Sequence, residues 1–264
     1  MTSDTVATSR SSAMPRRSQR AWRMTLAQAV MELRLTIRRG ENLLVTFLIP
    51  IALLVFFSTV PALAPTSGRA IDFVLPGIIA LTVISTSLVS LGISTGYERS
   101  YGILKRLGGS PLPRPGLLSA KILAVVVVEA VQVGLVLAVA AGALGWSPLP
   151  GQSPAMVLGA LLLGTCTFAG LGLLMAGTLR AEATLAGANG LYLLFLLLGG
   201  ILVPLSGLPA EVGGFARLLP AAALSDLVRG GFGVAAGDPA TPAAVLVAWA
   251  IGALALASRT FRWD

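Results

Sequence analysis

Few side chains in this chain are suited to catalysis. The 264 residues contain no histidine, one cysteine (Cys166) and 11 acidic residues. Histidine is the commonest general base and metal ligand, and a lone cysteine can form no internal disulfide. Neither Lys105 nor Lys121 follows a glycine, so no G-x-x-x-x-G-K-[ST] loop for ATP occurs. The acidic residues form no close cluster for Mg²⁺, which leaves transport, a channel or a scaffold as the function.

One short charged segment lies between two long apolar runs. On a helical wheel, its polar arc consists of Glu98, Arg99, Gly102, Lys105 and Arg106. The opposite arc consists of Tyr97, Ser100, Tyr101, Ile103, Leu104 and Leu107. Gly108-Gly109 and then Pro111 are helix-stop signals. We therefore predict a short amphipathic helix, which either receives a soluble partner or only anchors the loop at the membrane interface.

The composition predicts an all-α integral membrane protein. The chain is 55% hydrophobic and 11% charged, whereas ordinary soluble domains are about 25% charged. A bilayer core requires roughly 20 apolar residues per helix, and strand-type alternation is absent. Six predicted transmembrane helices follow, at about residues 43–63, 73–96, 122–144, 155–179, 186–205 and 242–257.

The distribution of positive charge predicts the orientation. Sixteen of the 19 Lys and Arg residues fall before the first span, between spans two and three, between spans four and five, or in the C-terminal tail. The other loops contain only Arg69, Arg217 and Arg229. Because cytoplasmic loops are enriched in Lys and Arg, we expect both termini in the cytoplasm. The abundance of Ala, Gly and Arg is typical of a bacterial genome rich in G and C.

Three further segments complete the predicted organisation. Residues 1–20 are polar and form a predicted disordered tail, and residues 21–264 form one transmembrane domain. From Trp22 to Arg39 an apolar stripe beside Arg23, Arg34 and Arg38 predicts an amphipathic helix on the inner leaflet, with packing on a cytosolic partner as the alternative. Between spans five and six, a semi-apolar stretch ending near Phe232 predicts short helices at the outer face.

Glu129 is the one acidic residue deep inside a predicted span, with Gln132 one turn further on the same face. A carboxylate in hydrocarbon is costly, so it should face protein or water. Two roles stay open. Glu129 and Gln132 are either polar positions on a substrate or proton path, or Glu129 is a neutral group in a structural hydrogen bond.

The charged segment resembles a known signature. Glu98-Arg99-Ser100-Tyr101-Gly102-Ile103-Leu104-Lys105-Arg106-Leu107, followed by Ser110-Pro111-Leu112, is similar to the E-R-x-x-G-T-L-x-x-L…S-P-L pattern of type-2 ABC transporter (ABC-2) permeases, with Ile103 where threonine is common. The resemblance extends to the amphipathic elbow helix before span one, to the P-L-S-x-L-P stretch from Pro204, and to the L-P…D-x-x-R-G run from Leu219 to Gly230.

This resemblance implies an ATP-driven exporter in a bacterial plasma membrane. The segment would be the coupling helix, which docks on an ABC ATPase subunit. The polar contacts of this helix would come from Glu98, Arg99, Lys105 and Arg106. Its apolar contacts would come from Tyr101, Leu104 and Leu107. Gly102, which has no side chain, would allow the helix to approach the ATPase closely. The partner ATPase would bind ATP and Mg, so this chain would need no cofactor of its own.

A second permease, the same or a sister chain, would complete the transporter among membrane lipids, without nucleic acid. The apolar spans favour a lipophilic substrate such as a drug, an antibiotic or a lipid. There are two alternatives. One is an ion-coupled carrier that uses Glu129, and the other is a membrane scaffold that transports nothing.

Overall fold

The computed structural model describes residues 16–38, 40–59, 69–108, 114–201, 205–207, 209–234 and 237–261. Across these ranges the regular structure is helical and contains no strand, as the composition predicts. The elements are α1 (Arg16–Arg38), α2 (Gly40–Thr59), α3 (Ala70–Ile84), η2 (Ser85–Ser90), α4 (Leu91–Ser100), α5 (Ile103–Gly108), α6 (Arg114–Gly142), α7 (Pro154–Thr178), α8 (Ala181–Leu198), η3 (Leu205–Gly207), α9 (Ala210–Ala216), α10 (Pro220–Gly231) and α11 (Ala240–Thr260).

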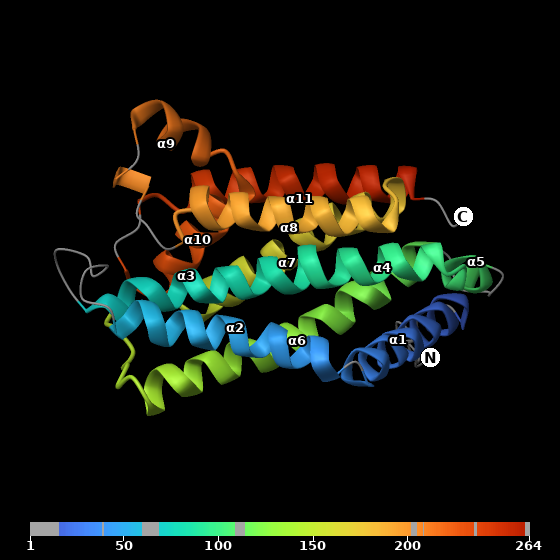
Figure 1. Ribbon diagram of the computed structural model, residues 1–264, viewed down its shortest axis with the longest axis horizontal. Helices are drawn as coiled ribbons and strands as arrows, with labels where there is room; N and C mark the ends of the chain where they lie inside the picture. The colour runs from blue at the N-terminus through green and yellow to red at the C-terminus, as the bar shows by residue number, and fades with distance from the viewer. Residues whose placement is uncertain are drawn as a thin grey trace, which may run out of the picture.

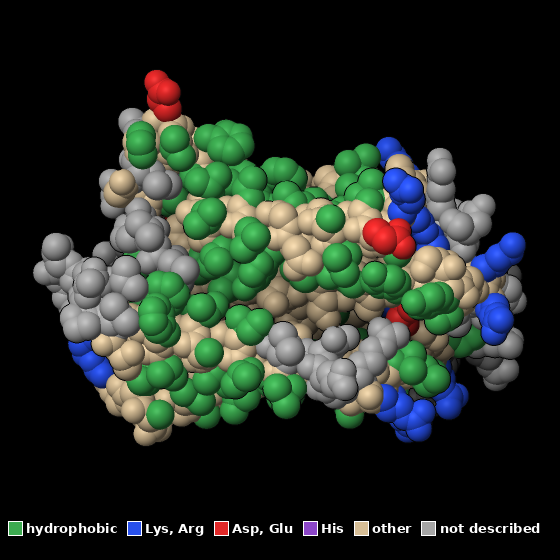
Figure 2. All heavy atoms as spheres, in the orientation of Figure 1, with side chains coloured by type: hydrophobic (Ala, Val, Ile, Leu, Met, Phe, Trp, Pro, Cys, Tyr) green, Lys and Arg blue, Asp and Glu red, His purple; other side chains and the backbone are tan. Residues whose placement is uncertain are grey.

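The long helices run side by side along the longest axis of the molecule (Figure 1). α1, α5 and the end of α11 lie at one end of this bundle, whereas η3, α9 and α10 lie at the other (Figure 1). On the face in Figure 2, most Lys and Arg side chains gather at the end that contains α1 and α5. The bundle is therefore polarised in charge along the direction that its apolar helices follow.

Five helices in the described residues are long and apolar enough to cross a membrane. They are Ala70–Ser100, Pro115–Gly142, Pro154–Thr178, Ala181–Leu198 and Ala240–Thr260. Each one overlaps a predicted span. Ala181–Leu198 ends well before the end of the predicted 186–205 range, whereas Ala240–Thr260 is longer than the predicted 242–257 range. The predicted first span corresponds to α2, in which Thr46–Thr59 forms a shorter apolar helix, and residues 60–68 lie outside the described part of the chain.

The N-terminal helix begins earlier than the sequence indicates. α1 starts at Arg16, so residues 16–20 are helical and are not part of a disordered tail; residues 1–15 lie outside the described ranges. α1 packs along α6 through a side that buries Thr25 and Ala29. Its other side leaves apolar side chains exposed, namely Trp22, Val30, Met31 and Ile37.

The charged segment is not one continuous helix. α3, η2 and α4 form one helical stretch that ends at Ser100. In the most apolar segment of this stretch, 83% is buried inside the bundle. Tyr101 and Gly102 then form a turn in which Gly102 has a φ of +70°, a value that favours glycine. The short α5 follows. The prediction of one amphipathic helix over residues 97–107 was therefore wrong beyond Ser100. The turn changes the direction in which the residues after it point.

α7 packs against helices on several sides, and glycine permits the closest of these contacts. A Cβ atom at Gly172 would lie 2.8 Å from the carbonyl oxygen of Leu88, and one at Gly92 would lie 3.1 Å from the Cα of Gly172. Close backbone approach of this kind strengthens helix packing where the solvent offers no hydrophobic driving force. The pair thereby fixes the distance between α7 and the η2–α4 stretch.

α10 enters the bundle and contacts α3, α7 and α11. Its Arg229 donates hydrogen bonds to Ser225 Oγ (2.6 Å) and to Ile201 O (3.0 Å), and its guanidinium lies 4.2 Å from the ring centroid of Phe73. Burial lowers the pKa of Arg229 to about 10, against the opposing effect of Asp226, so the side chain stays cationic at neutral pH. The D-x-x-R-G run therefore has a structural role, because Arg229 ties α10 to α3 and to the chain after α8.

The close approach at Gly172 yields a stability prediction. Gly172→Ala should lower the free energy of unfolding by about 1–3 kcal/mol, because the added methyl group meets backbone that cannot rotate away. Unfolding of the purified protein in detergent, followed by circular dichroism, measures the change. The matched control on the same helix is Gly159→Ala, where an added Cβ meets nothing within 4 Å. Equal stability of the two variants would contradict the proposed packing role.

Candidate functional site

The corner between α4 and α5 presents an exposed mixed surface. Tyr101 is 71% exposed and Ile103 is 41% exposed, and Lys105 and Arg106 follow on α5 with exposed side chains. Arg99 is half-buried and donates to the carbonyl oxygen of Leu179, which ties the corner to the end of α7. An aromatic and an aliphatic side chain exposed beside two cations are typical of a protein contact surface.

Two residues predicted for a partner contact instead face the interior of this chain. Leu104 is completely buried, in an apolar cluster with Leu91, Leu117, Leu118, Val125, Ala169, Leu173, Ala257 and Phe261. Glu98 is also buried, with 6% of the whole residue exposed. The structure therefore makes both side chains internal anchors of the corner. Gly102 forms the turn, with open space where a Cβ would be, and the side chain of Leu107 lies outside the described part.

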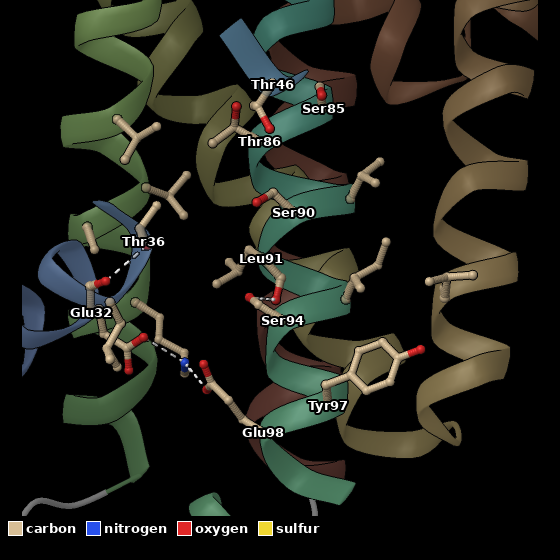
Figure 3. A pocket seen from close by; sticks show the side chains of 18 of the residues that line it. Glu32, Thr36, Thr46, Ser85, Thr86, Ser90, Leu91, Ser94, Tyr97 and Glu98 are labelled. Carbon is tan, nitrogen blue, oxygen red and sulfur yellow. Dashed lines mark hydrogen bonds and ion pairs between the residues drawn. The ribbon is translucent and has the colours of Figure 1, made fainter. Parts of the chain in front are cut away.

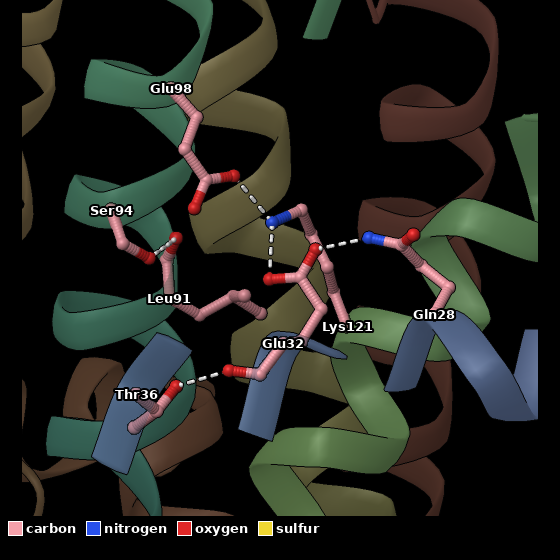
Figure 4. Close-up of polar contacts among 7 residues, drawn as sticks. All are labelled: Gln28, Glu32, Thr36, Leu91, Ser94, Glu98 and Lys121. Atoms are coloured by element: carbon pink, nitrogen blue, oxygen red, sulfur yellow. Dashed lines mark hydrogen bonds and ion pairs between the residues drawn. The ribbon is translucent and has the colours of Figure 1, made fainter. Parts of the chain in front are cut away.

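Glu98 belongs to a buried ion triad, which Figure 4 shows from close by. Lys121 Nζ lies 2.6 Å from Glu98 Oε2 and 3.0 Å from Glu32 Oε2. Gln28 donates a further hydrogen bond of 2.9 Å to Glu32 Oε1. The side chains of Lys121, Glu32 and Glu98 are 1%, 12% and 8% exposed. Since they come from α6, α1 and α4, the triad joins three helices near the end of the bundle that contains α5.

A cavity of about 800 Å³ lies beside the triad (Figure 3). α1, α2 and α6 line one side, η2 and α4 line the floor, and α8 lines the other side. Hydroxyl groups are numerous on its walls, from Thr36, Thr46, Ser85, Thr86, Ser90, Ser94, Tyr97, Tyr101 and Tyr192. Its volume lies within the range of roughly 300–1,000 Å³ that is usual for small-molecule sites.

Glu129 and Gln132 lie beside this cavity and do not line it. Thr86, which does line it, donates to Gln132 Oε1 (2.7 Å), and Gln132 donates to the Thr46 carbonyl (3.0 Å). Ser87 donates to one carboxyl oxygen of Glu129, and Thr165 contacts the other. The two predicted polar positions thus hold η2 against α2, α6 and α7.

The hydrogen-bond geometry around Glu129 favours a neutral carboxyl. The Thr165 hydroxyl contacts both Glu129 Oε2 and the Leu161 carbonyl (2.8 Å), yet it has a single hydrogen. If Glu129 is protonated and donates to Thr165, the Thr165 hydroxyl directs its one hydrogen to Leu161, and both contacts are two-centre hydrogen bonds. A neutral carboxyl also avoids the cost of a charge among apolar helices. This geometry favours the structural role of Glu129 over the proton-path role.

Sequence reasoning missed Glu32 and treated Lys121 only as a loop charge. A signal was available: Glu32 is the one acidic residue among the basic and apolar residues from Trp22 to Arg39, and Lys121 begins an apolar run. Charged residues at the ends of apolar segments are frequently paired. The spacing of these residues gives no indication of which partners they find.

Comparison with known proteins identifies the family. A family model described as "ABC-2 type transporter" matches residues 25–232, a range that includes α1 to α10 apart from the first residues of α1. The chain belongs to the ABC-2 type transporter family. A Bacillus subtilis (strain 168) protein named "Putative transport permease YvfS" is 28% identical over 212 residues, which cover 77% of this chain and 85% of that relative.

Family membership and the apolar helices together establish a coarse function. This ABC-2 permease is a multi-pass membrane protein and a component of transmembrane transport. The resemblance stated on the charged segment is thereby confirmed at the level of the family.

The buried triad yields a prediction for Lys121. Lys121→Met should lower the free energy of unfolding by about 3–5 kcal/mol, because it leaves two buried carboxylates without their shared cation. Detergent-based unfolding provides the measurement, with Lys105→Met as the exposed control. Adding Glu32→Gln and Glu98→Gln to Lys121→Met should recover most of the loss. A single variant as stable as the parent would show that the triad contributes little.

The protonated state of Glu129 yields a second prediction. In Glu129→Gln, the amide donates to Thr165 and its oxygen accepts from Ser87, so stability and transport should stay within about twofold of the parent. Glu129→Leu removes both contacts and should destabilise the protein by about 1–3 kcal/mol. Transport assays in membrane vesicles and unfolding curves test the two variants. Abolished transport in a stable Glu129→Gln protein would restore the proton-path role.

Proposed function

We propose that this chain is the permease subunit of an ATP-driven exporter and that the α4–α5 corner receives an ABC ATPase subunit. The proposal rests on the exposed surface of this corner, together with membership of a family that moves substrates across membranes. Tyr101 and Ile103 are exposed beside Lys105 and Arg106, while Leu104 anchors the corner within the chain. An exposed surface on a firmly held base suits the transmission of force from a partner.

Two internal connections would carry a movement of α5 into the membrane domain. Leu104 packs in a cluster that contains residues of α6, α7 and α11. Glu98, one turn before the corner, joins α4 to α6 and α1 through Lys121 and Glu32. A push on the corner therefore reaches four other helices without a flexible segment between them, as a rigid-body switch requires.

The same proposal gives the chain an orientation in a bacterial plasma membrane. The end that contains α1, α5 and the last turn of α11 would face the cytoplasm, because the Lys and Arg side chains gather there. α1 would be the elbow helix, with Trp22, Val30 and Ile37 in contact with the inner leaflet. α2 would be the first of six spans, and α9 would lie at the outer face.

The energy source and the substrate follow from this arrangement. ATP and Mg would be bound by the partner ATPase, and a second permease would complete the transporter. The cavity between α4, α6 and α8 would belong to the export path of a lipophilic substrate. The ion-coupled carrier is less well supported, because Glu129 is engaged with Ser87 and Thr165 beside the cavity.

Co-purification tests the proposal. The tagged chain is purified from membranes of its native host, and the ABC ATPase retained per permease is measured. Lys105→Glu combined with Arg106→Glu should reduce retention about tenfold or more, because exposed cations at an interface become anions. Arg259→Glu, also exposed at the same end on α11, is the matched control and should retain the ATPase.

Export provides the second readout of the same variants. ATP-dependent uptake of the transported substrate into inverted membrane vesicles should fall in the double variant, in step with ATPase retention. It should stay normal in the Arg259→Glu control. Full retention and full uptake in the double variant would remove the α4–α5 corner as the site of ATPase contact.

A further inference from the structure

We propose that the cavity binds an amphipathic organic cation, with the cationic group at the end that Glu32, Tyr97 and Tyr101 line. This inference rests on the proposed function, since it names the substrate class of the exporter. The cationic group of the ligand would lie at the end of the cavity nearest to α5. The ligand would therefore enter from the side of the α4–α5 corner.

The charges on the cavity wall favour a cation. Among its described lining residues, the acidic and basic side chains are Glu32, Glu98 and Lys121, and none is an arginine. Lys121 already contacts both carboxylates, so its charge is compensated before any ligand arrives. Each oxygen of Glu32 accepts one hydrogen bond, from Gln28 or from Lys121, and has a second lone pair for a ligand.

Two aromatic rings lie at the same end of the cavity. Tyr97 and Tyr101 both line it, and their rings stack with centroids 6.1 Å apart and planes 29° apart. Figure 3 shows the Tyr97 side chain extending toward α8 while Glu98 points toward the triad. Aromatic faces attract cations within about 6 Å, and a carboxylate close by adds to that attraction. Aromatic rings with a carboxylate suit an organic cation better than a strongly hydrated metal ion.

The rest of the cavity suits the body of such a molecule. Ser85 and Ser90 are the first and last residues of η2, a π-helix, and both line the cavity. Both hydroxyls are thereby available on the cavity wall to a ligand. Val89, Ile93 and Leu185 supply apolar wall between the hydroxyls. A ligand with an apolar skeleton and a few hydrogen-bonding groups would match this wall.

Two probes of equal shape and opposite charge test the inference. Tetraphenylphosphonium and tetraphenylborate are measured in separate samples by equilibrium dialysis against the full chain in lipid nanodiscs. Saturable binding should occur with the phosphonium and not with the borate. Glu32→Gln should weaken phosphonium binding about tenfold or more, because it removes the carboxylate that faces the cation. Glu182→Gln, an exposed carboxylate on α8 outside the cavity, is the matched control and should bind as the parent does.

A second variant leaves the ion triad intact. Tyr97→Leu should weaken phosphonium binding about threefold or more through loss of the aromatic face. Unfolding curves confirm that each variant is folded before binding is compared. Equal binding of the two probes, or unchanged phosphonium binding in folded Glu32→Gln and Tyr97→Leu, would overturn the inference.

The outcome is separable from that of the proposed function. A chain that retains its ATPase but shows no saturable phosphonium binding refutes the cation site and leaves the exporter assignment intact. Saturable phosphonium binding by a chain that associates with no ATPase supports the cation site and contradicts the ATP-driven mechanism.

Discussion

The buried ammonium of Lys121 is the interaction on which this permease depends most. One cation between two carboxylates holds together three helices that are far apart in the sequence, α1, α4 and α6. A lysine this deeply buried is tolerated only with such compensation, and losing the lysine leaves two carboxylates without a cation. The same contact determines where the corner after α4 points and which side of α1 faces the bundle. The cavity wall, the corner and the N-terminal helix therefore share one electrostatic support.

The membrane environment explains the other polar contacts. Hydrocarbon offers no water to an unpaired group, so a polar side chain inside the bundle is stabilised by a protein partner. Gln132 and Glu129 hold η2 against its neighbours, and Arg229 performs the equivalent task for α10 at the opposite end. Glycine contributes where no side chain fits, as between Gly92 and Gly172. Polar pairs and close backbone contacts thereby replace the hydrophobic effect that orders the core of a soluble protein.

The sequence predicted the local features of this structure well and the non-local ones poorly. Apolar runs and stop signals gave the positions of the long helices, because length and hydropathy are properties of one segment. The Glu32–Lys121 pair, in contrast, joins residues 89 positions apart, and no periodicity indicates such a partner. The π-helix and the turn at Gly102 were also missed, since both depend on how the stretch packs. For this reason Glu98 and Leu104 were expected to face a partner, although both face the interior.

The order of the triad along the chain has a consequence for biogenesis. Glu32 and Glu98 both leave the ribosome before Lys121, so α1 has no cationic anchor until α6 begins to emerge. Docking of α1 along α6 closes a long stretch of chain, which carries an entropic cost. The contact between α1 and α6 therefore forms only after the helices between them have been synthesised. α1 precedes α6 in the chain by several elements, yet its ion pair can form only once the lysine near the start of α6 is available.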